Sequence, residues 1–342
     1  MINVAINGFG RIGRMIFRAG FKDKKINFVA INDLTPTDNL AYLLKYDSAH
    51  GKFNGNVSSD KNSLIIGDSP SKKNKKIPVF SEKDPAKLPW KKLKVDVVIE
   101  STGFFLTKEL ASKHLKAGAK KVILSAPAKN KGDNNDIKTL VYGVNHKEYN
   151  QKKDNIISNA SCTTNCLAPI AKVLDDNFGI ISGLVTTVHA YTSTQKVVDL
   201  ASSKHRRGRA AAVNMIPTTT GAAIATTLVL PKLKDKIDGM AIRVPVVNGS
   251  IVDFTCQLKQ VVDVEKVNSA FEIAARSKDL KNVFEYSEEE LVSTDILTNP
   301  HSSIFDSKLT KVINGNSIKV FSWYDNEWGY SNRIIDMVKI ML

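Results

Sequence analysis

The sequence predicts an α/β protein of two domains: a doubly wound parallel sheet, then an α+β domain with a mixed or antiparallel sheet. In the first half, short β-branched runs alternate with helical patterns, which is typical of a parallel sheet with helices on both faces. In the second half, long strand patterns follow one another with few helices between them. The 342 residues suffice for two domains of about 100–200 residues each.

The elements of the first half follow from hydrophobic runs that are bounded by turn residues. The expected strands are Ile2–Asn7, Ile26–Ile31, Val95–Glu100 and Lys121–Leu124, and the expected helices are Pro36–Tyr46 and Lys108–Ala117. A polar stretch, Asn145–Asp154, is the expected boundary between the domains.

The second half is richer in strands. The expected strands are Ile181–His189, Met240–Val247, Ile251–Gln260 and Lys311–Trp323. Apolar positions at helical spacing predict a helix over Val264–Ser277, and the chain closes with an amphipathic helix over Trp328–Leu342.

A G-x-G-x-x-G motif lies between the first strand and a helical pattern, as in Rossmann-type domains. We expect Gly8 to make the tight turn, Gly10 to admit a pyrophosphate and Gly13 to allow close helix–strand packing. The helix start then offers free N–H groups to the phosphates. Asp33, at the end of the second strand, can accept the ribose hydroxyls and would repel a 2′-phosphate, so NAD is favoured over NADP.

Cys162 lies at the start of another helical pattern and is flanked by Ser161 and Thr163. We expect this position to lower the pKa of the thiol, because the helix dipole favours the anion. A base is still needed, and His189 at the end of a strand is the candidate. Cys166, four residues further on, and Cys256 read as core residues, because two cysteines at this spacing make a poor zinc site.

Composition narrows the class of protein. No secretory signal is evident, and no apolar run approaches the ~18 residues that suggest a membrane span. Three cysteines do not make a disulfide framework and point to a reducing compartment. The net charge of +15, partly in lysine clusters, admits nucleic acid as a partner, but a solvated surface is the favoured explanation because no aromatic interleaving or zinc-finger spacing accompanies the clusters.

These motifs resemble the glyceraldehyde-3-phosphate dehydrogenase family, and the resemblance runs essentially from end to end. It is carried by NGFGRIGR, LLKYDSAHGKFNG, ESTGFF, SAPAK, VYGVNH, SNASCTTNCLAP, HAYTSTQ, IPTTTGAA, RVPVVNGS and WYDNEWGYSNR. It implies an NAD-binding domain at 1–160, completed by a C-terminal helix at 327–342, and a catalytic, tetramer-forming domain at 161–326. It also implies a cytoplasmic homotetramer.

The resemblance implies phosphorylating oxidation of glyceraldehyde 3-phosphate with NAD through a thioester on Cys162, with His189 as base and no metal. Thr192 and Arg243 match the residues that hold the substrate's phosphate. The region that receives inorganic phosphate is matched by Ser161, Thr163, Arg207, Thr220 and Gly221. Cofactor-lining positions are matched by Arg11, Ile12, Asp33, Lys83, Ser125 and Asn326, with Tyr330 near the nicotinamide.

The sequence also departs from the family pattern. The loop Ala201–His205 replaces the usual Pro-His-Lys-Asp-Leu and bears on how strictly NADP is excluded. The segment Asp68–Lys76 is longer than usual and is expected to be an exposed loop. Ile224 replaces a frequent lysine, and no consequence follows from that change.

Two alternatives remain at this stage. Erythrose-4-phosphate dehydrogenase shares the scaffold, and only the detail of the phosphate-binding loops separates it from the triose enzyme. A nucleic-acid- or surface-binding protein on the same scaffold is the alternative of another class, motivated by the net charge.

Overall fold

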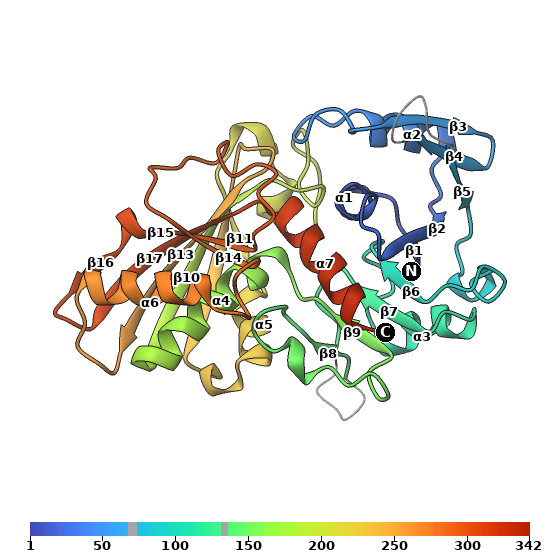
Figure 1. Cartoon of the computed structure of the whole chain (residues 1–342). Coiled ribbons are helices and arrows are strands. Elements are labelled where there is room, and N and C mark those ends of the chain that lie inside the picture. Colours follow the sequence, from blue (N-terminus) through green and yellow to red (C-terminus); the bar gives the residue numbers. More distant parts are fainter. Residues whose placement is uncertain (68–73, 131–135) are drawn as a thin grey trace. The chain divides into compact units, whose positions relative to one another are not determined.

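The computed structural model describes residues 1–67, 74–130 and 136–342, shown in Figure 1. These residues form two compact units. The first unit contains Met1–Leu140, Glu148–Ala160 and Ile334–Leu342, and the second contains Val141–Lys147 and Ser161–Arg333. Most of the loop expected at residues 68–76 lies outside the described residues, and its last two residues begin a strand.

The first unit is built on one sheet. Its strands are β1 (Ile2–Asn7), β2 (Ile26–Asn32), β3 (Asn56–Asp60), β4 (Ser63–Gly67), β5 (Lys75–Phe80), β6 (Val97–Glu100), β7 (Lys121–Leu124), β8 (Lys138–Thr139) and β9 (Ile156–Ser158). They lie in the order β3-β4-β5-β2-β1-β6-β7-β9-β8. All neighbours from β5 to β8 pair in parallel, whereas β4 is antiparallel to both of its neighbours, β3 and β5.

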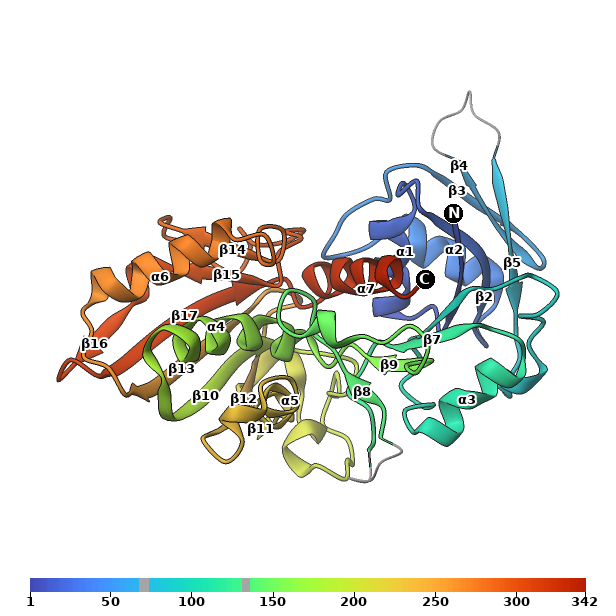
Figure 2. The same ribbon diagram turned by 60° about the horizontal axis from the view of Figure 1, so that its bottom comes forward.

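The predicted doubly wound sheet is confirmed. The chain moves from β1 to β2 in one direction and from β6 to β7 in the other. Because such crossovers are right-handed, α1 (Arg11–Gly20) and α3 (Lys108–Lys116) must cover opposite faces, as Figures 1 and 2 show. The helix predicted over 36–46 is α2 (Thr37–Lys45). The antiparallel edge formed by β3 and β4 was not predicted.

The second unit has a mixed sheet, as predicted. Its strands are β10 (Ile180–Ala190), β11 (Ile216–Thr219), β12 (Ile237–Val244), β13 (Ser250–Leu258), β14 (Phe284–Ser287), β15 (Ser303–Asp306), β16 (Lys311–Ile313) and β17 (Ser317–Tyr324). They lie in the order β11-β12-β10-β13-β17-β15-β14, with β16 beside β17. β10 pairs in parallel with β12 and antiparallel with β13.

Helices cover one face of this second sheet. The helices α4 (Cys162–Phe178) and α6 (Val264–Arg276) pack with β13 and β17 around one apolar core, and α5 (Ala222–Val229) packs against α4. Along β10, Val185, Thr187 and His189 are buried, whereas Leu184 on the opposite face is exposed. Since successive side chains of a strand alternate between faces, His189 points to the helix-covered side.

The prediction of one strand over Lys311–Trp323 was wrong, because β16 and β17 form a hairpin there. Three residues, 314–316, connect them, and Asn314 and Gly315 have positive φ angles of 52° and 72°. Asn-Gly between strand patterns is typical of hairpins because both residues adopt positive φ readily. That dipeptide was the local signal for the turn.

The residues of the final helix, α7 (Trp328–Ile340), are divided between the two units. Its beginning belongs to the second unit, and residues Ile334–Leu342 belong to the first. Ile334, Met337, Val338 and Met341 are fully buried. The Tyr149 hydroxyl, also in the first unit, donates a hydrogen bond to the backbone oxygen of Met341.

Candidate active site

The glycine turn lies where the strand order of the first sheet reverses, between the carboxyl ends of β1 and β6. Gly8 has a φ of +91°, and a Cβ there would lie 2.7 Å from the backbone nitrogen of Thr102. A Cβ at Gly13 would lie 2.1 Å from the carbonyl oxygen of Gly8. At Gly10 a Cβ would meet no atom within 4 Å. The first two glycines permit close backbone packing, and Gly10 leaves open space of the kind a ligand needs.

Asp33 closes this turn from β2. Its Oδ2 accepts a hydrogen bond from the Phe9 backbone N–H at 2.7 Å, and its Oδ1 accepts one from that of Thr35 at 2.9 Å. Each carboxylate oxygen can accept more than one hydrogen bond, so capacity remains for a hydroxyl ligand. Within the described residues, no side chain caps the start of α1 and its first turn holds no acid. Its dipole is therefore open to an anion.

The other residues predicted to line the cofactor are distributed around this turn. The Arg11 guanidinium forms an ion pair with Asp47 on the neighbouring loop. The Ser125 hydroxyl donates to the Glu100 backbone oxygen at 3.1 Å, at the end of β6. Ile12 is half-buried in α1, and Lys83 is exposed. Among the residues that the structure describes, Lys83 has no contact that supports a role.

In the second unit, α4 begins at Cys162, as predicted. Ser161 is its N-cap residue, and the Ser161 hydroxyl accepts a hydrogen bond from the Thr164 backbone N–H at 3.1 Å. Serine at this position stabilises a helix start by satisfying a free N–H group. The cap fixes Cys162 in the first turn, where the thiol is half-buried, while Cys166 and Cys256 are buried as expected.

The structure brings Cys162 and His189 together. The Cys162 sulfur lies 3.5 Å from His189 Nε2. His189 Nδ1 lies 2.7 Å from the Ala190 backbone oxygen and 2.6 Å from Arg243 Nη1. Arg243 Nη1 has its own acceptor in the Ala190 oxygen at 3.0 Å. We therefore assign the imidazole proton to Nδ1, because a bare nitrogen would repel the nearby oxygen. Nε2 is then free to take the thiol proton.

Burial controls the protonation of this pair. It raises the pKa of the Cys162 thiol, while the positive charge of Arg243 acts in the opposite direction. The helix start acts in the expected direction, since its backbone N–H groups lower the thiol pKa, but loss of hydration outweighs them and the net shift is upward. Burial, followed by the charge of Arg243, lowers the pKa of His189 to about 3. The imidazole is thus neutral at pH 7 and can act as a base.

Tyr324 packs against His189 and was not among the predicted site residues. Its buried hydroxyl lies 2.8 Å from the Thr163 hydroxyl and 2.8 Å from the Thr187 hydroxyl. Its ring meets the His189 ring edge-on, with centroids 5.9 Å apart. Tyr324 thereby ties the first turn of α4 to β10, the strand that carries His189. The WYDNEWGY motif contained the residue, but no local pattern indicated this role.

The residues expected to bind phosphate fall into separate local groups. Next to the thiol pair, Arg243 has a buried Nε atom with no hydrogen-bond partner among the described residues. An unpaired buried donor is costly and points to a ligand. On the loop after β10, the Thr192 hydroxyl lies 2.8 Å from that of Thr194, and the Thr192 backbone N–H donates to Gln195.

A second basic group lies at β11. Arg207 Nε donates to the Thr218 hydroxyl at 2.9 Å, and its Nη2 donates to the Thr219 backbone oxygen at 3.2 Å. These contacts set the guanidinium beside the segment that continues into Thr220 and Gly221. The Thr220 hydroxyl accepts from the Ala222 N–H at the start of α5. A Cβ at Gly221 would meet no atom within 4 Å, so the space beside it is open.

Asn326 and Tyr330 lie buried near the start of α7. The Asn326 side-chain oxygen accepts hydrogen bonds from the Gly249 N–H and from the Ser250 hydroxyl. The Ser250 hydroxyl also accepts one from the Ala190 N–H, next to His189. The amide orientation of Asn326 is therefore fixed, with its oxygen turned inward. Burial raises the pKa of Tyr330, and the charge of Cys162 adds to that shift.

Across residues 1–67, 74–130 and 136–342, no group of three metal-binding side chains is present, and no helix could cross a membrane.

Comparisons with known proteins agree along the whole chain. Residues 2–108 match the family model "Glyceraldehyde 3-phosphate dehydrogenase, NAD binding domain", and residues 161–326 match that family's C-terminal domain. The chain is 53% identical to glyceraldehyde-3-phosphate dehydrogenase 1 of Bacillus subtilis over 98% of the chain and 97% of the relative. It is 53% identical over the same shares to the enzyme of Geobacillus stearothermophilus. The Streptomyces coelicolor enzyme is 52% identical, with the same coverage.

Proposed function

The chain belongs to the glyceraldehyde-3-phosphate dehydrogenase family, and from this premise we propose how its residues perform the reaction. The reaction is the NAD-dependent phosphorylating oxidation of D-glyceraldehyde 3-phosphate to 1,3-bisphosphoglycerate. The observation that carries the proposal is the contact between Cys162 and the unprotonated Nε2 of His189. Neither alternative from the sequence analysis is favoured by a specific observation.

Catalysis begins when the Cys162 sulfur attacks the aldehyde carbon and its proton passes to His189 Nε2. A carbon–sulfur bond forms, and the carbonyl π electrons move onto the oxygen, which takes up that proton from His189 to give a hemithioacetal and leaves Nε2 free again. The backbone N–H of Cys162, at the start of α4, is suited to stabilise the negative oxygen. His189 then accepts the hydroxyl proton as the carbon loses hydride, and a thioester remains. Bound NAD would supply the hydride acceptor.

Inorganic phosphate completes the cycle. One of its oxygens attacks the thioester carbon, the carbon–sulfur bond breaks, and Cys162 leaves as a thiolate that takes back a proton from His189 Nε2. The oxidation energy is kept in the acyl phosphate. Two phosphate groups must be bound, and we assign them to the groups around Arg243 with Thr192 and around Arg207 with Thr220. Guanidinium groups bind phosphate in a bidentate manner, which suits this task.

The first unit has the features that NAD requires. The space beside Gly10 and the uncapped start of α1 suit a pyrophosphate, and Asp33 has remaining capacity for ribose hydroxyls. We assign cofactor binding to residues 1–160 with the end of α7, and the chemistry to residues 161–326. We also assign Arg11, Ile12, Ser125 and Asn326 to the cofactor; the inward oxygen of Asn326 leaves its NH₂ group as the donor.

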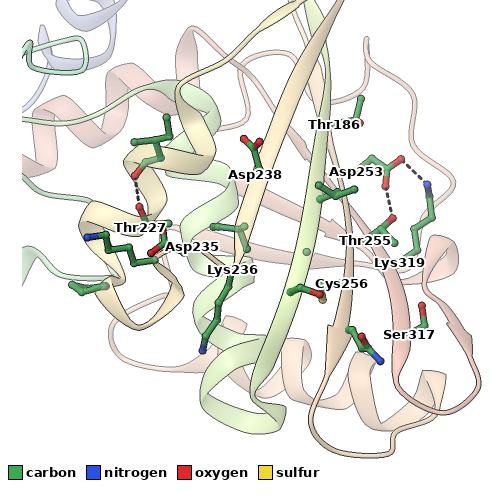
Figure 3. Close-up of a pocket in the computed structure, with 18 of the residues that line it drawn as sticks. Thr186, Thr227, Asp235, Lys236, Asp238, Asp253, Thr255, Cys256, Ser317 and Lys319 are labelled. Atoms are coloured by element: carbon green, nitrogen blue, oxygen red, sulfur yellow. Dashed lines mark hydrogen bonds and ion pairs between the residues drawn. The ribbon is translucent and has the colours of Figure 1, made fainter.

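The open face of the second sheet supports the proposal of a homotetramer. It carries a hollow of about 1290 Å³, lined by β10, α5, β12 and β13 and shown in Figure 3. Leu184 and Ile224 at this hollow are 69% and 65% exposed. Single exposed apolar residues need no explanation, but a group of them on one face marks an interaction surface. The hollow contains none of the thiol-site residues, so we assign it to subunit contacts rather than to substrate.

Disrupting this face tests the assembly. We expect Leu184→Asp to shift sedimentation velocity profiles from tetramer toward smaller species. Leu342→Asp, at the exposed chain end, is the matched control. A native chain that sediments as a monomer would refute the proposed tetramer.

All three cysteines are free thiols, which supports a reducing, cytoplasmic setting.

The decisive assay follows NADH absorbance with glyceraldehyde 3-phosphate, with and without inorganic phosphate or arsenate. We expect sustained turnover only when one of these anions is present, because each displaces the thioester. Cys162→Ser should abolish turnover while NAD binding persists. Equal turnover by Cys162→Ser, or strict preference for erythrose 4-phosphate, would refute the assignment.

A further inference from the structure

Beneath the glycine turn of the first unit lies a buried polar cluster with no part in the reaction just described. It consists of Trp90, His114 and Glu100, each with 0% of its surface exposed. Because these side chains are sealed from solvent, none of them can touch a ligand in this structure. Burying a carboxylate and an imidazole is costly unless their hydrogen bonds are satisfied, so the contacts of this cluster show what it holds in place.

Trp90 determines the state of His114. The Trp90 indole N–H lies 3.0 Å from His114 Nδ1, and an indole nitrogen can only donate. His114 Nδ1 must therefore accept this bond and carry no proton. The imidazole proton is then on Nε2, which donates to Glu100 Oε2 at 3.0 Å. His114 is thus a neutral donor with a fixed tautomer.

Glu100 is held by four donors. Besides His114, the Asn7 amide donates to Oε2 at 2.6 Å, and the Thr102 backbone N–H donates to Oε1 at 2.7 Å. The Thr102 hydroxyl also donates to Oε1. These four hydrogen bonds satisfy both oxygens of the buried Glu100 side chain.

Three of these donors, from Asn7 and Thr102, belong to the two segments that form the cofactor turn, the end of β1 and the loop after β6. Asn7 is the residue directly before Gly8, and its backbone oxygen accepts a hydrogen bond from the Ser101 N–H at 2.7 Å. The Thr102 nitrogen is the atom that approaches closest to the missing Cβ of Gly8. The Glu100 carboxylate therefore links the end of β1 to the loop after β6, which fixes the separation of the two segments.

We propose that Trp90, His114 and Glu100 are positioning residues that set the shape of the glycine turn and thereby the affinity for NAD. The inference rests on the proposed function, since it assumes that the turn binds the cofactor pyrophosphate. Phosphate recognition by backbone N–H groups depends on their fixed positions. A carboxylate anchored by a tautomer-locked histidine holds these positions before the cofactor arrives, which lowers the ordering cost of binding.

The test compares three variants with a matched control. Glu100→Gln keeps the shape but replaces one acceptor oxygen by a donor, so at least two of the four donors lose their partner. Trp90→Phe removes only the donor to His114, and Thr102→Val removes only the hydroxyl donor to Glu100. Val97→Ala, on the same strand, removes buried methyl groups and leaves the polar cluster intact. NAD affinity is measured by calorimetry on the full-length protein.

We expect Glu100→Gln to weaken NAD binding about tenfold and the two milder variants about threefold, as loss of buried hydrogen bonds implies. Turnover at saturating NAD should stay within about twofold of native, because the thiol site is unchanged. Hydrogen exchange of the amides at residues 101–104 should accelerate in the NAD-free variants and not in Val97→Ala.

Two results would overturn the inference. One is NAD affinity in Trp90→Phe and Thr102→Val equal to that of Val97→Ala, which decides the matter even if Glu100→Gln does not fold. The other is a fall in turnover at saturating NAD with unchanged affinity. Failure of the native protein to bind NAD would instead refute the proposed function, so the two failures can be distinguished.

Discussion

Each unit buries one histidine beneath its site, and the two differ in their partners. His114 accepts from an indole and donates to the carboxylate of Glu100, so each ring nitrogen has one partner of the matching kind. His189 faces a thiol on one side and the guanidinium of Arg243 on the other, and its pKa falls to about 3. His114 therefore keeps its proton on Nε2, bonded to Glu100. His189 can exchange a proton, because its Nε2 faces the Cys162 thiol. Mutations that affect one site and spare the other test this contrast.

The largest expected effect separates the two histidines directly. His189→Asn should lower kcat by about 10²–10⁴-fold, since it removes the general base. NAD affinity should be unchanged. Steady-state turnover and calorimetry check the two quantities. The matched His114→Asn should reverse this pattern, with weaker NAD binding and nearly native kcat. Equal losses of kcat in both variants would contradict the division.

His189 has the Arg243 guanidinium beside it, whereas the partners of His114 are Trp90 and Glu100. Arg243→Ala should raise KM for glyceraldehyde 3-phosphate about 10- to 100-fold, the cost of losing hydrogen bonds to a charged group. It should also raise the pKa of His189, because Arg243 lowers it in the native protein. The acid limb of the kcat/KM profile should therefore move to higher pH. An unchanged KM would remove Arg243 from the substrate site.

The buried His189 also makes folding sensitive to acid. Its folded pKa lies below the ordinary value of 6.5, so between pH 6.5 and about 3 the unfolded chain binds a proton that the folded chain does not. The free energy of unfolding should therefore decrease as the pH falls through this window, by about 1.4 kcal/mol per pH unit from His189. Above pH 6.5 His189 should have no effect on stability. Denaturant titrations at pH 7, 6 and 5 should show this slope in the native protein and a smaller slope in His189→Asn.

The smallest expected effect concerns cofactor choice in the first unit. Asp33→Gly should improve the use of NADP relative to NAD by about tenfold, because the carboxylate no longer repels a 2′-phosphate. The ratio of kcat/KM values for the two cofactors measures this. An unchanged ratio would refute the role of Asp33 at the ribose.

The parts of the fold that were predictable are those specified by neighbours in the sequence. The glycine turn, the N-cap at Ser161 and the start of α4 each depend on a few consecutive residues. The hairpin turn at Asn314 and Gly315 was equally local and was overlooked inside a long strand pattern.

What could not be predicted depends on residues far apart in the chain. The bond between Thr163 and Tyr324 spans 161 positions, and that between Asn7 and Glu100 spans 93. No period or motif in one sequence signals such pairs. The direction of the Cys162 pKa shift failed for the same reason, since burial comes from the whole fold whereas the helix start is visible locally.

The division of α7 between the units has a consequence for biosynthesis. Residues Ile334–Leu342 supply buried side chains to the unit that the ribosome makes first. That unit must therefore stay incompletely packed until residues 334–342 have left the ribosomal exit tunnel. A fragment that stops before residue 334 would leave part of the first unit's core exposed. A bulky fusion directly after Leu342 would hinder the packing of that unit.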